Sequence, residues 1–239
     1  NSMVSELYNK TVGLKDAPAA SVSGGDLLSW GYYHYGRFSF STPGWWVPQT
    51  KPDTAKKQKA FTENNDEANY LRWAEQQKIE NTFTNWTSVK HPDFPNQKVE
   101  IGGIDAFAMI NPPYKLVPSL VKEHTQFIAT LATMAPELDL VNLKTEKLEG
   151  GLTRITVDVI NKGAIPTQTK VGEKSNWLKN IQVNLTTNGQ ILSGKANQTI
   201  GAIGGYGSQT LTWLIKASGK VTIKVQSPQN GTKSLDINL

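Results

Sequence analysis

A chain of 239 residues is long enough for one or two domains and for a sizeable hydrophobic core. Its 38% hydrophobic and 19% charged residues, with 20 Gly and 12 Pro, exclude collagen-like, low-complexity and strongly disordered proteins. The absence of Cys excludes disulfides, thiolate zinc sites and cysteine nucleophiles. No apolar run approaches the roughly 18 residues of a membrane helix, so we expect no membrane span, and the first residues show no signal-peptide pattern.

The formal net charge of +5 is unevenly distributed. Residues 1–136 carry 13 Lys and Arg against 13 Asp and Glu, whereas residues 137–239 carry 12 against 7. The basic residues of the second part are scattered singly, and Arg154 is the only arginine there. Because a nucleic-acid site is typically a cluster of basic side chains, this pattern indicates a solvated basic surface and no nucleic-acid partner.

Three segments of the first part have helical patterns. Residues 25–36 can begin a helix at Asp26 and end it at Gly36, since glycine is favoured just after a helix C-terminus. Residues 65–79 have Asn65 as a candidate N-cap and acidic residues in the first turn. Residues 118–134 repeat apolar residues at helical spacing over a broad face.

Eight aromatic residues lie between Trp30 and Trp46. Such a cluster is either part of a core or a platform on which a sugar or peptide stacks. We expect core positions for Trp30, Tyr32, Phe38 and Phe40. Trp45 and Trp46 follow Pro43-Gly44, which favours a loop, and both interpretations stay open for them. The candidate binding residues are Trp45, Trp46, Tyr35 and Arg37.

Residues 39–41 and 99–101 have the pattern of interior strands of a parallel sheet, for which further strands and covering helices are needed. The three histidines, His34, His91 and His124, have no spacing that places two of them on one side of a metal ion. We therefore expect no metal site in this chain.

Strict alternation of apolar and polar residues begins after Pro136. It is clearest in residues 154–160, 210–215, 221–225 and 235–239, and turn signals such as Asn188-Gly189 and Asn230-Gly231 separate these segments. About seven short strands in a hundred residues predict an immunoglobulin-like antiparallel β-sandwich over residues 137–239. Together with the helices of residues 1–136, this gives an α+β fold class.

Several motifs resemble the C-terminal part of bacterial zinc carboxypeptidases of the carboxypeptidase A type. They are Ser23-Gly24-Gly25, residues 28–32, residues 36–42, residues 99–103, Asn111-Pro112-Pro113 and residues 161–167. The resemblance implies that residues 1–136 are the last portion of a carboxypeptidase-like α/β domain with a linker, and that residues 137–239 are its appended β-sandwich. It also implies a secreted or periplasmic bacterial protein.

The sequence departs from that family at the catalytic positions. The family's zinc ligands would precede Asn1, and Pro43 stands where its catalytic glutamate is expected, with no acid between Ser41 and Val47. Proline cannot accept a proton from zinc-bound water. We therefore expect this chain alone to be inactive and without zinc, although zinc is possible in the parent protein. Its expected role is structural support, with possible substrate or partner contact, and its expected partner is the upstream part of the same polypeptide.

Two alternatives stay open. The chain is a glycan- or peptide-binding module, or it is part of an active metallopeptidase whose metal site lies upstream.

Overall fold

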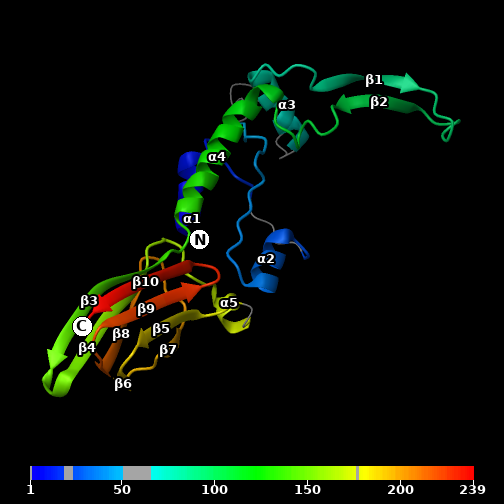
Figure 1. Ribbon diagram of the computed structural model, residues 1–239. Coiled ribbons are helices and arrows are strands. Elements are labelled where there is room, and N and C mark those ends of the chain that lie inside the picture. Colours follow the sequence, from blue (N-terminus) through cyan, green and yellow to red (C-terminus); the bar gives the residue numbers. More distant parts are fainter. Residues whose placement is uncertain (1, 19–23, 51–65, 176–177) are drawn as a thin grey trace. The chain divides into compact units, whose positions relative to one another are not determined.

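The computed structural model describes residues 2–18, 24–50, 66–175 and 178–239 (Figure 1). The chain divides into two compact units. Unit 1 comprises residues 1–21 and 42–129, and unit 2 comprises residues 22–41 and 130–239. This division differs from the boundary at residue 136 that the sequence suggests, because the segment 22–41 belongs with the C-terminal strands.

Unit 1 is built mainly from helices α1 (Ser2–Thr11), α3 (Asp66–Gln76) and α4 (Val117–Thr133). The last residues of α4, from 130 onward, are assigned to unit 2. A short 3-10 turn, Tyr114–Leu116, precedes α4. The predicted helices over 65–79 and 118–134 are therefore present, although the cap proposed at Asn65 lies outside the described residues. Unit 1 has a small core of Trp45, Tyr70, Trp73 and Ala74.

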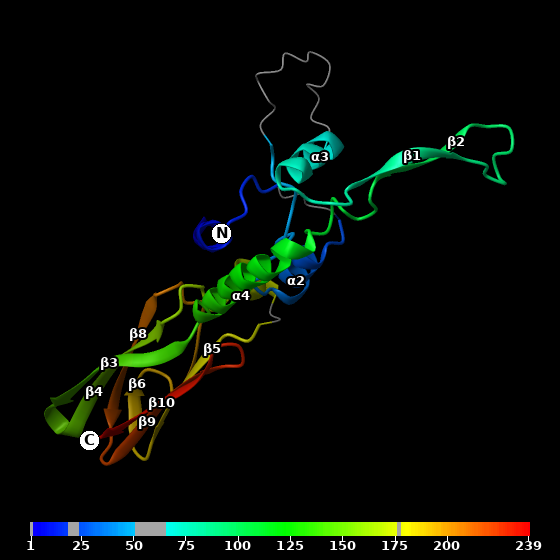
Figure 2. The same ribbon diagram turned by 90° about the horizontal axis from the view of Figure 1, so that it is seen from above.

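Strands β1 (Phe83–Val89) and β2 (Val99–Ile104) form an antiparallel hairpin that projects away from α3 (Figures 1 and 2). The expected interior strand at residues 99–101 is thus wrong, because β2 pairs with β1 alone and Ile101 is 58% exposed. Residues 39–41 form no strand. The physical reason is the same for both segments. They have strand-like sequences, but the described residues supply no neighbouring parallel strands with which to pair.

Unit 2 contains two four-stranded antiparallel sheets (Figures 1 and 2). The first has the order β3-β4-β8-β6, with bounds Leu138–Leu148, Leu152–Asn161, Ser208–Lys216 and Gln190–Ser193. The second has the order β10-β9-β5-β7, with bounds Gly231–Asn238, Lys220–Ser227, Ile181–Thr187 and Asn197–Ile200. A 3-10 turn at Glu149–Gly151 joins β3 to β4. Helices α2 (Leu27–Tyr35) and α5 (Lys170–Ser175) complete the unit.

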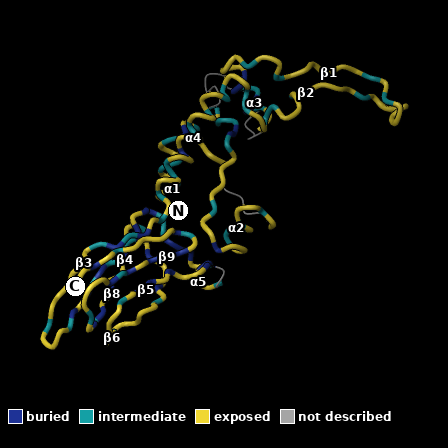
Figure 3. Tube along the Cα trace, in the orientation of Figure 1, coloured by how far each residue is buried: buried dark blue, intermediate teal, exposed yellow. Residues whose placement is uncertain are grey.

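One hydrophobic cluster takes its residues from both sheets. The alternating residues of β4, β5, β8 and β9 that face it are fully or almost fully buried, as the alternation of dark blue along these strands shows in Figure 3: Ile155, Val157, Val159, Ile181, Val183, Leu185, Leu211, Trp213, Ile215, Val221, Ile223 and Val225. Trp213 also donates its indole Nε1–H to the Lys195 carbonyl at 2.9 Å. The α+β class and the period-two strands predicted from the sequence are confirmed.

Candidate functional site

Two of the predicted binding residues, Trp45 and Trp46, lie in the core of unit 1. They are 6% and 8% exposed. The Trp45 ring packs near Trp73, with 5.9 Å between ring centroids, and Trp46 donates its Nε1–H to the Lys15 carbonyl at 2.7 Å. Both residues lie in an irregular segment, as Pro43-Gly44 favours, and of the two interpretations left open the burial of their rings supports the core one, where their large apolar area is best buried.

The opposite correction applies to the aromatic residues before them. Trp30, Phe38 and Phe40, expected in a core, are 50%, 40% and 42% exposed, and Tyr32 is half-buried. None of the nine residues of α2 is buried. We call its exposed apolar and aromatic side chains the α2 surface: Leu27, Leu28, Trp30, Tyr33 and Tyr35.

The rings of α2 pack on one another instead of on a core. Trp30 stacks on His34 with 5.5 Å between ring centroids, and Tyr35 meets Trp30 edge-on at 4.8 Å. The predicted binding residue Tyr35 therefore belongs to the α2 surface and remains 42% exposed.

Both ends of α2 are fixed as the sequence predicts. The Asp26 carboxylate accepts a hydrogen bond from the Ser29 backbone N–H at 2.7 Å, which lowers the pKa of Asp26 because it favours the charged form. Gly36 has a φ of 64° and donates its N–H to the Tyr32 carbonyl, which closes the helix.

The C-terminus of α2 is attached to α5 by a close backbone approach. A Cβ at Gly36 would lie 2.4 Å from the Gly172 Cα, so no larger residue fits there. Thr169 donates its hydroxyl to the Gly36 carbonyl at 2.6 Å and accepts the Gly172 N–H at 2.9 Å. This junction fixes where the next residue, Arg37, leaves the helix.

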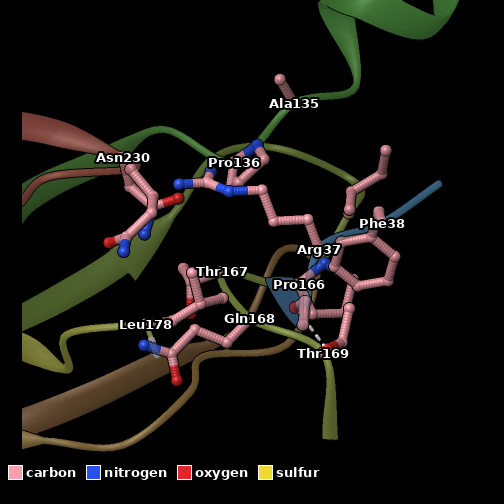
Figure 4. A pocket seen from close by; sticks show the side chains of 13 residues that line it. Arg37, Phe38, Ala135, Pro136, Pro166, Thr167, Gln168, Thr169, Leu178 and Asn230 are labelled. Carbon is pink, nitrogen blue, oxygen red and sulfur yellow. Dashed lines mark hydrogen bonds between the residues drawn. The ribbon is translucent and has the colours of Figure 1, made fainter. Parts of the chain in front are cut away.

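Arg37 lies beside a cavity of about 240 Å³ within unit 2 (Figure 4). Its side chain extends across the cavity toward Asn230. The cavity is lined by residues of four segments and by Leu178: residues 36–38, 135–136, 165–169 and 229–230. The sequence therefore identified one lining side chain, Arg37, as a binding residue.

Two buried amide side chains of this cavity were missed. Gln168 and Asn230 are 4% and 8% exposed, and neither the Gln168 Oε1 nor the Asn230 Oδ1 has a hydrogen-bond partner within the described residues. The sequence identified Asn230 as a turn residue, and no sequence signal distinguishes Gln168 from a surface glutamine. Burial of an unpaired acceptor is visible only once the fold is known.

The three histidines serve separate local contacts. His124 bonds Tyr8 Oη at 3.2 Å and the Leu120 carbonyl at 2.9 Å, and His91 lies 3.9 Å from the Asp93 carboxylate. The described part of the chain contains no group of three His, Cys, Asp or Glu side chains that could hold a metal ion. Pro43, at the position of the expected glutamate, lies in an irregular segment. No helix among the described residues is long and apolar enough to cross a membrane.

Comparison with known proteins identifies little. Residues 137–238 match a family described as "Domain of unknown function (DUF8731)". No curated protein matches the chain. The solved structures with similarity include β-glucosidases from Streptomyces venezuelae (12% identity, TM-score 0.23), Bifidobacterium adolescentis (11%, 0.24) and Thermotoga neapolitana (11%, 0.22). Each match covers 44% of this chain, which spans only 15–17% of those proteins, and we take neither fold nor function from them.

Proposed function

We propose that this chain is a non-catalytic part of a larger secreted or periplasmic protein similar to bacterial zinc carboxypeptidases, and that its α2 surface docks against the upstream part of the same polypeptide. The observation that carries the proposal is the exposure of α2. Five apolar or aromatic residues of a nine-residue helix are 41–77% exposed, and none of the nine is buried.

Such a helix is unusual as a free surface. A helix that is apolar on several sides is normally stabilised by burial against other elements, and contiguous exposed apolar patches typically mark interaction sites. The caps at Asp26 and Gly36 fix the helix ends, so the α2 surface is a preformed face. A partner that covers it gains the hydrophobic contribution of rings that are already positioned.

The proposal assigns residues 137–239 to an immunoglobulin-like sandwich. The strand order supports this, because β3-β4-β8-β6 corresponds to the A-B-E-D sheet of the constant-type fold and β10-β9-β5 to its G-F-C sheet. Strand β7 is then an additional edge strand beside β5.

In this proposal, any zinc site and catalytic acid of the parent protein lie upstream. The position of the glutamate in the resembled family is Pro43, and no carboxylate lies between Ser41 and Val47 to replace it. A glycan or peptide platform built on Trp45 and Trp46 is not part of the proposal, because both rings are buried.

The test is association with the upstream part of the parent polypeptide, supplied as a separate protein and measured by sedimentation velocity. We expect binding, and we expect the double variant Trp30→Ser, Tyr33→Ser to weaken it by at least about tenfold, as for aromatic anchors of interfaces. Tyr206→Ser is the matched control, because Tyr206 is 74% exposed in unit 2 but lies outside α2. No association, or equal loss in the control, would overturn the proposal.

A further inference from the structure

We propose that the cavity beside Arg37 binds a small carboxylate that carries an N–H or O–H donor next to the carboxylate and a short apolar group. This inference goes beyond the docking role of α2, because the cavity is lined by residues 36–38 and by the sandwich, not by the α2 surface. Three features of the cavity specify the three parts of the ligand: buried acceptors, one cationic side chain and an apolar wall.

The acceptor at Asn230 lies beside Ser227 and Gln229. The Ser227 hydroxyl donates its proton to the Gln229 Oε1 at 2.7 Å, and the Asn230 Nδ2 donates to the same hydroxyl at 3.1 Å. In this arrangement the Asn230 Oδ1 is left as a buried acceptor without a donor among the described residues.

The orientation of the Gln168 amide follows from its bond to a backbone carbonyl. Its Nε2 donates to the Lys179 carbonyl at 3.1 Å, and because a carbonyl can only accept, the amide cannot be reversed. The Oε1 is again left without a donor in the described part of the chain. A buried acceptor without a partner costs about 1–3 kcal/mol. Both oxygens are closed off from solvent, so a ligand that brings donors reaches them only when the amides turn about their broad terminal torsions toward the cavity.

The charge at the cavity comes from Arg37. Among the described lining residues it is the one ionised side chain, and none of the ion pairs of the described residues includes it. The guanidinium of an arginine presents a planar fork of donors that matches a carboxylate. Figure 4 shows this side chain reaching across the cavity toward Asn230. A ligand that pairs with Arg37 is therefore an anion, and its hydrogen-bond donor lies near the amides of Gln168 and Asn230.

The apolar part of the lining comes from Phe38, Pro136, Ile165, Pro166 and Leu178, and Thr167, Thr169 and Gln229 add polar side chains. The volume of about 240 Å³ is smaller than that of pockets for drug-sized ligands, which begin at about 300 Å³. A ligand with one short branched side chain is the size that fits. Amino acids and 2-hydroxy acids share the required chemistry, since each carries a donor on the carbon beside the carboxylate.

Four matched ligands separate these requirements in calorimetric titrations of the full chain. Leucine and 2-hydroxy-4-methylpentanoate carry both carboxylate and donor, 4-methylpentanoate lacks the donor, and leucinamide lacks the carboxylate. We expect leucine or 2-hydroxy-4-methylpentanoate to bind at least about tenfold more tightly than 4-methylpentanoate and leucinamide. A tenfold difference in affinity corresponds to the loss of one charge-assisted hydrogen bond. The preference between the first two identifies the donor as an amine or a hydroxyl.

Arg37→Gln should reduce binding of the best ligand by at least about tenfold, and Arg37→Lys by less, because the charge remains but the fork is lost. Arg154→Gln is the matched control, since Arg154 is the other arginine of unit 2 and is already paired with Glu146 at 2.6 Å. Gln168→Met should weaken binding while thermal unfolding shows that the variant is folded. No binding by any of the four ligands, equal binding by all, or equal loss in Arg37→Gln and Arg154→Gln would overturn the proposal.

Discussion

The strands of the two four-stranded sheets and helix α2 belong to the same compact unit, yet apolar residues are buried in the strands and exposed on the helix. Trp213 on β8 is fully buried, whereas Trp30 on α2 is 50% exposed. The inward residues of β4, β5, β8 and β9 meet an opposite sheet made by the same chain, so they are fully or almost fully buried. On α2, the Trp30 ring packs on His34 and Tyr35, and no residue of the helix is buried. The difference teaches that an apolar pattern predicts burial only where the chain itself supplies the covering surface.

The strongest test of this difference is to replace one tryptophan in each region and compare the effects on stability. Trp213→Ala should destabilise unit 2 by about 3–5 kcal/mol, because it removes a fully buried ring and leaves a cavity. Trp30→Ala should change the free energy of unfolding by less than about 0.5 kcal/mol, as at exposed sites generally. Denaturant titrations followed by circular dichroism measure both. Equal losses in the two variants would show that α2 is as integral to the unit as the strands.

A second variant tests whether unit 1 is energetically separate. Trp73→Ala removes a ring that is 5% exposed in the small cluster with Trp45 and Tyr70. We expect a loss of about 3 kcal/mol, at the low end of the range for a buried aromatic residue. Hydrogen exchange should become faster in α3 and stay unchanged in β4, β8 and β9. Faster exchange in those strands as well would mean that the two units unfold together.

The sequence was informative wherever a local signal is sufficient. Asp26 and Gly36 bound α2 as expected, because caps depend on the backbone of a single turn. The strands around Ile155 and Trp213 follow from their alternation. The parallel sheet expected at residues 39–41 and 99–101 depended instead on parallel partner strands elsewhere. The described residues contain none, and β2 pairs only antiparallel with β1.

The candidate site was predictable only in part. Arg37 was identified as a binding residue, but Gln168 and Asn230 were not, because their importance lies in an unpaired oxygen created by the fold. The inversion between Trp30 and Trp45 has a similar cause. Composition shows that aromatic residues gather between positions 30 and 46, but it does not show which of them face other parts of the chain.

The close approach of α2 and α5 at Gly36 and Gly172 can be tested by substitution. Gly36→Ala should destabilise the helix end by about 2 kcal/mol, because alanine is strained at a φ of 64° and its Cβ would lie 2.4 Å from the Gly172 Cα. Gly25→Ala is the control. Its φ of 85° imposes a similar strain, but none of the described residues lies within 4 Å of the added carbon, so we expect a loss of about 1 kcal/mol. Limited proteolysis around residues 27–40 measures the loosening of α2, and equal cleavage of both variants would exclude a role for the contact with Gly172.

The smallest expected effect is the change in the stability of the strands and of α2 as the pH falls. In the sandwich, burial raises the pKa of Asp139, but hydrogen bonds from the Lys162 ammonium and the Leu140 N–H, with the charges of Lys162 and Lys233, lower it overall. Hydrogen bonds from Thr210 and Asn142 lower the pKa of Asp158. In α2, the Ser29 backbone N–H lowers the pKa of Asp26.

Since each folded-state pKa lies below its unfolded value of about 3.9, each carboxylate contributes stability that is fully present above that pH and is lost as the pH falls through the folded-state pKa. We expect the free energy of unfolding of unit 2 to fall on titration from pH 5 toward about pH 2. Asp139→Asn should reduce the slope of this free energy against pH, because Asp139 contacts Lys162 at 3.1 Å and is 19% exposed. Asp26→Asn keeps a capping side chain but removes the charge, so it should flatten the acid response of α2 alone, measured by hydrogen exchange at residues 29–36. An unchanged slope in Asp139→Asn would show that the ion pair with Lys162 contributes nothing to the folded sandwich, as many exposed pairs do not.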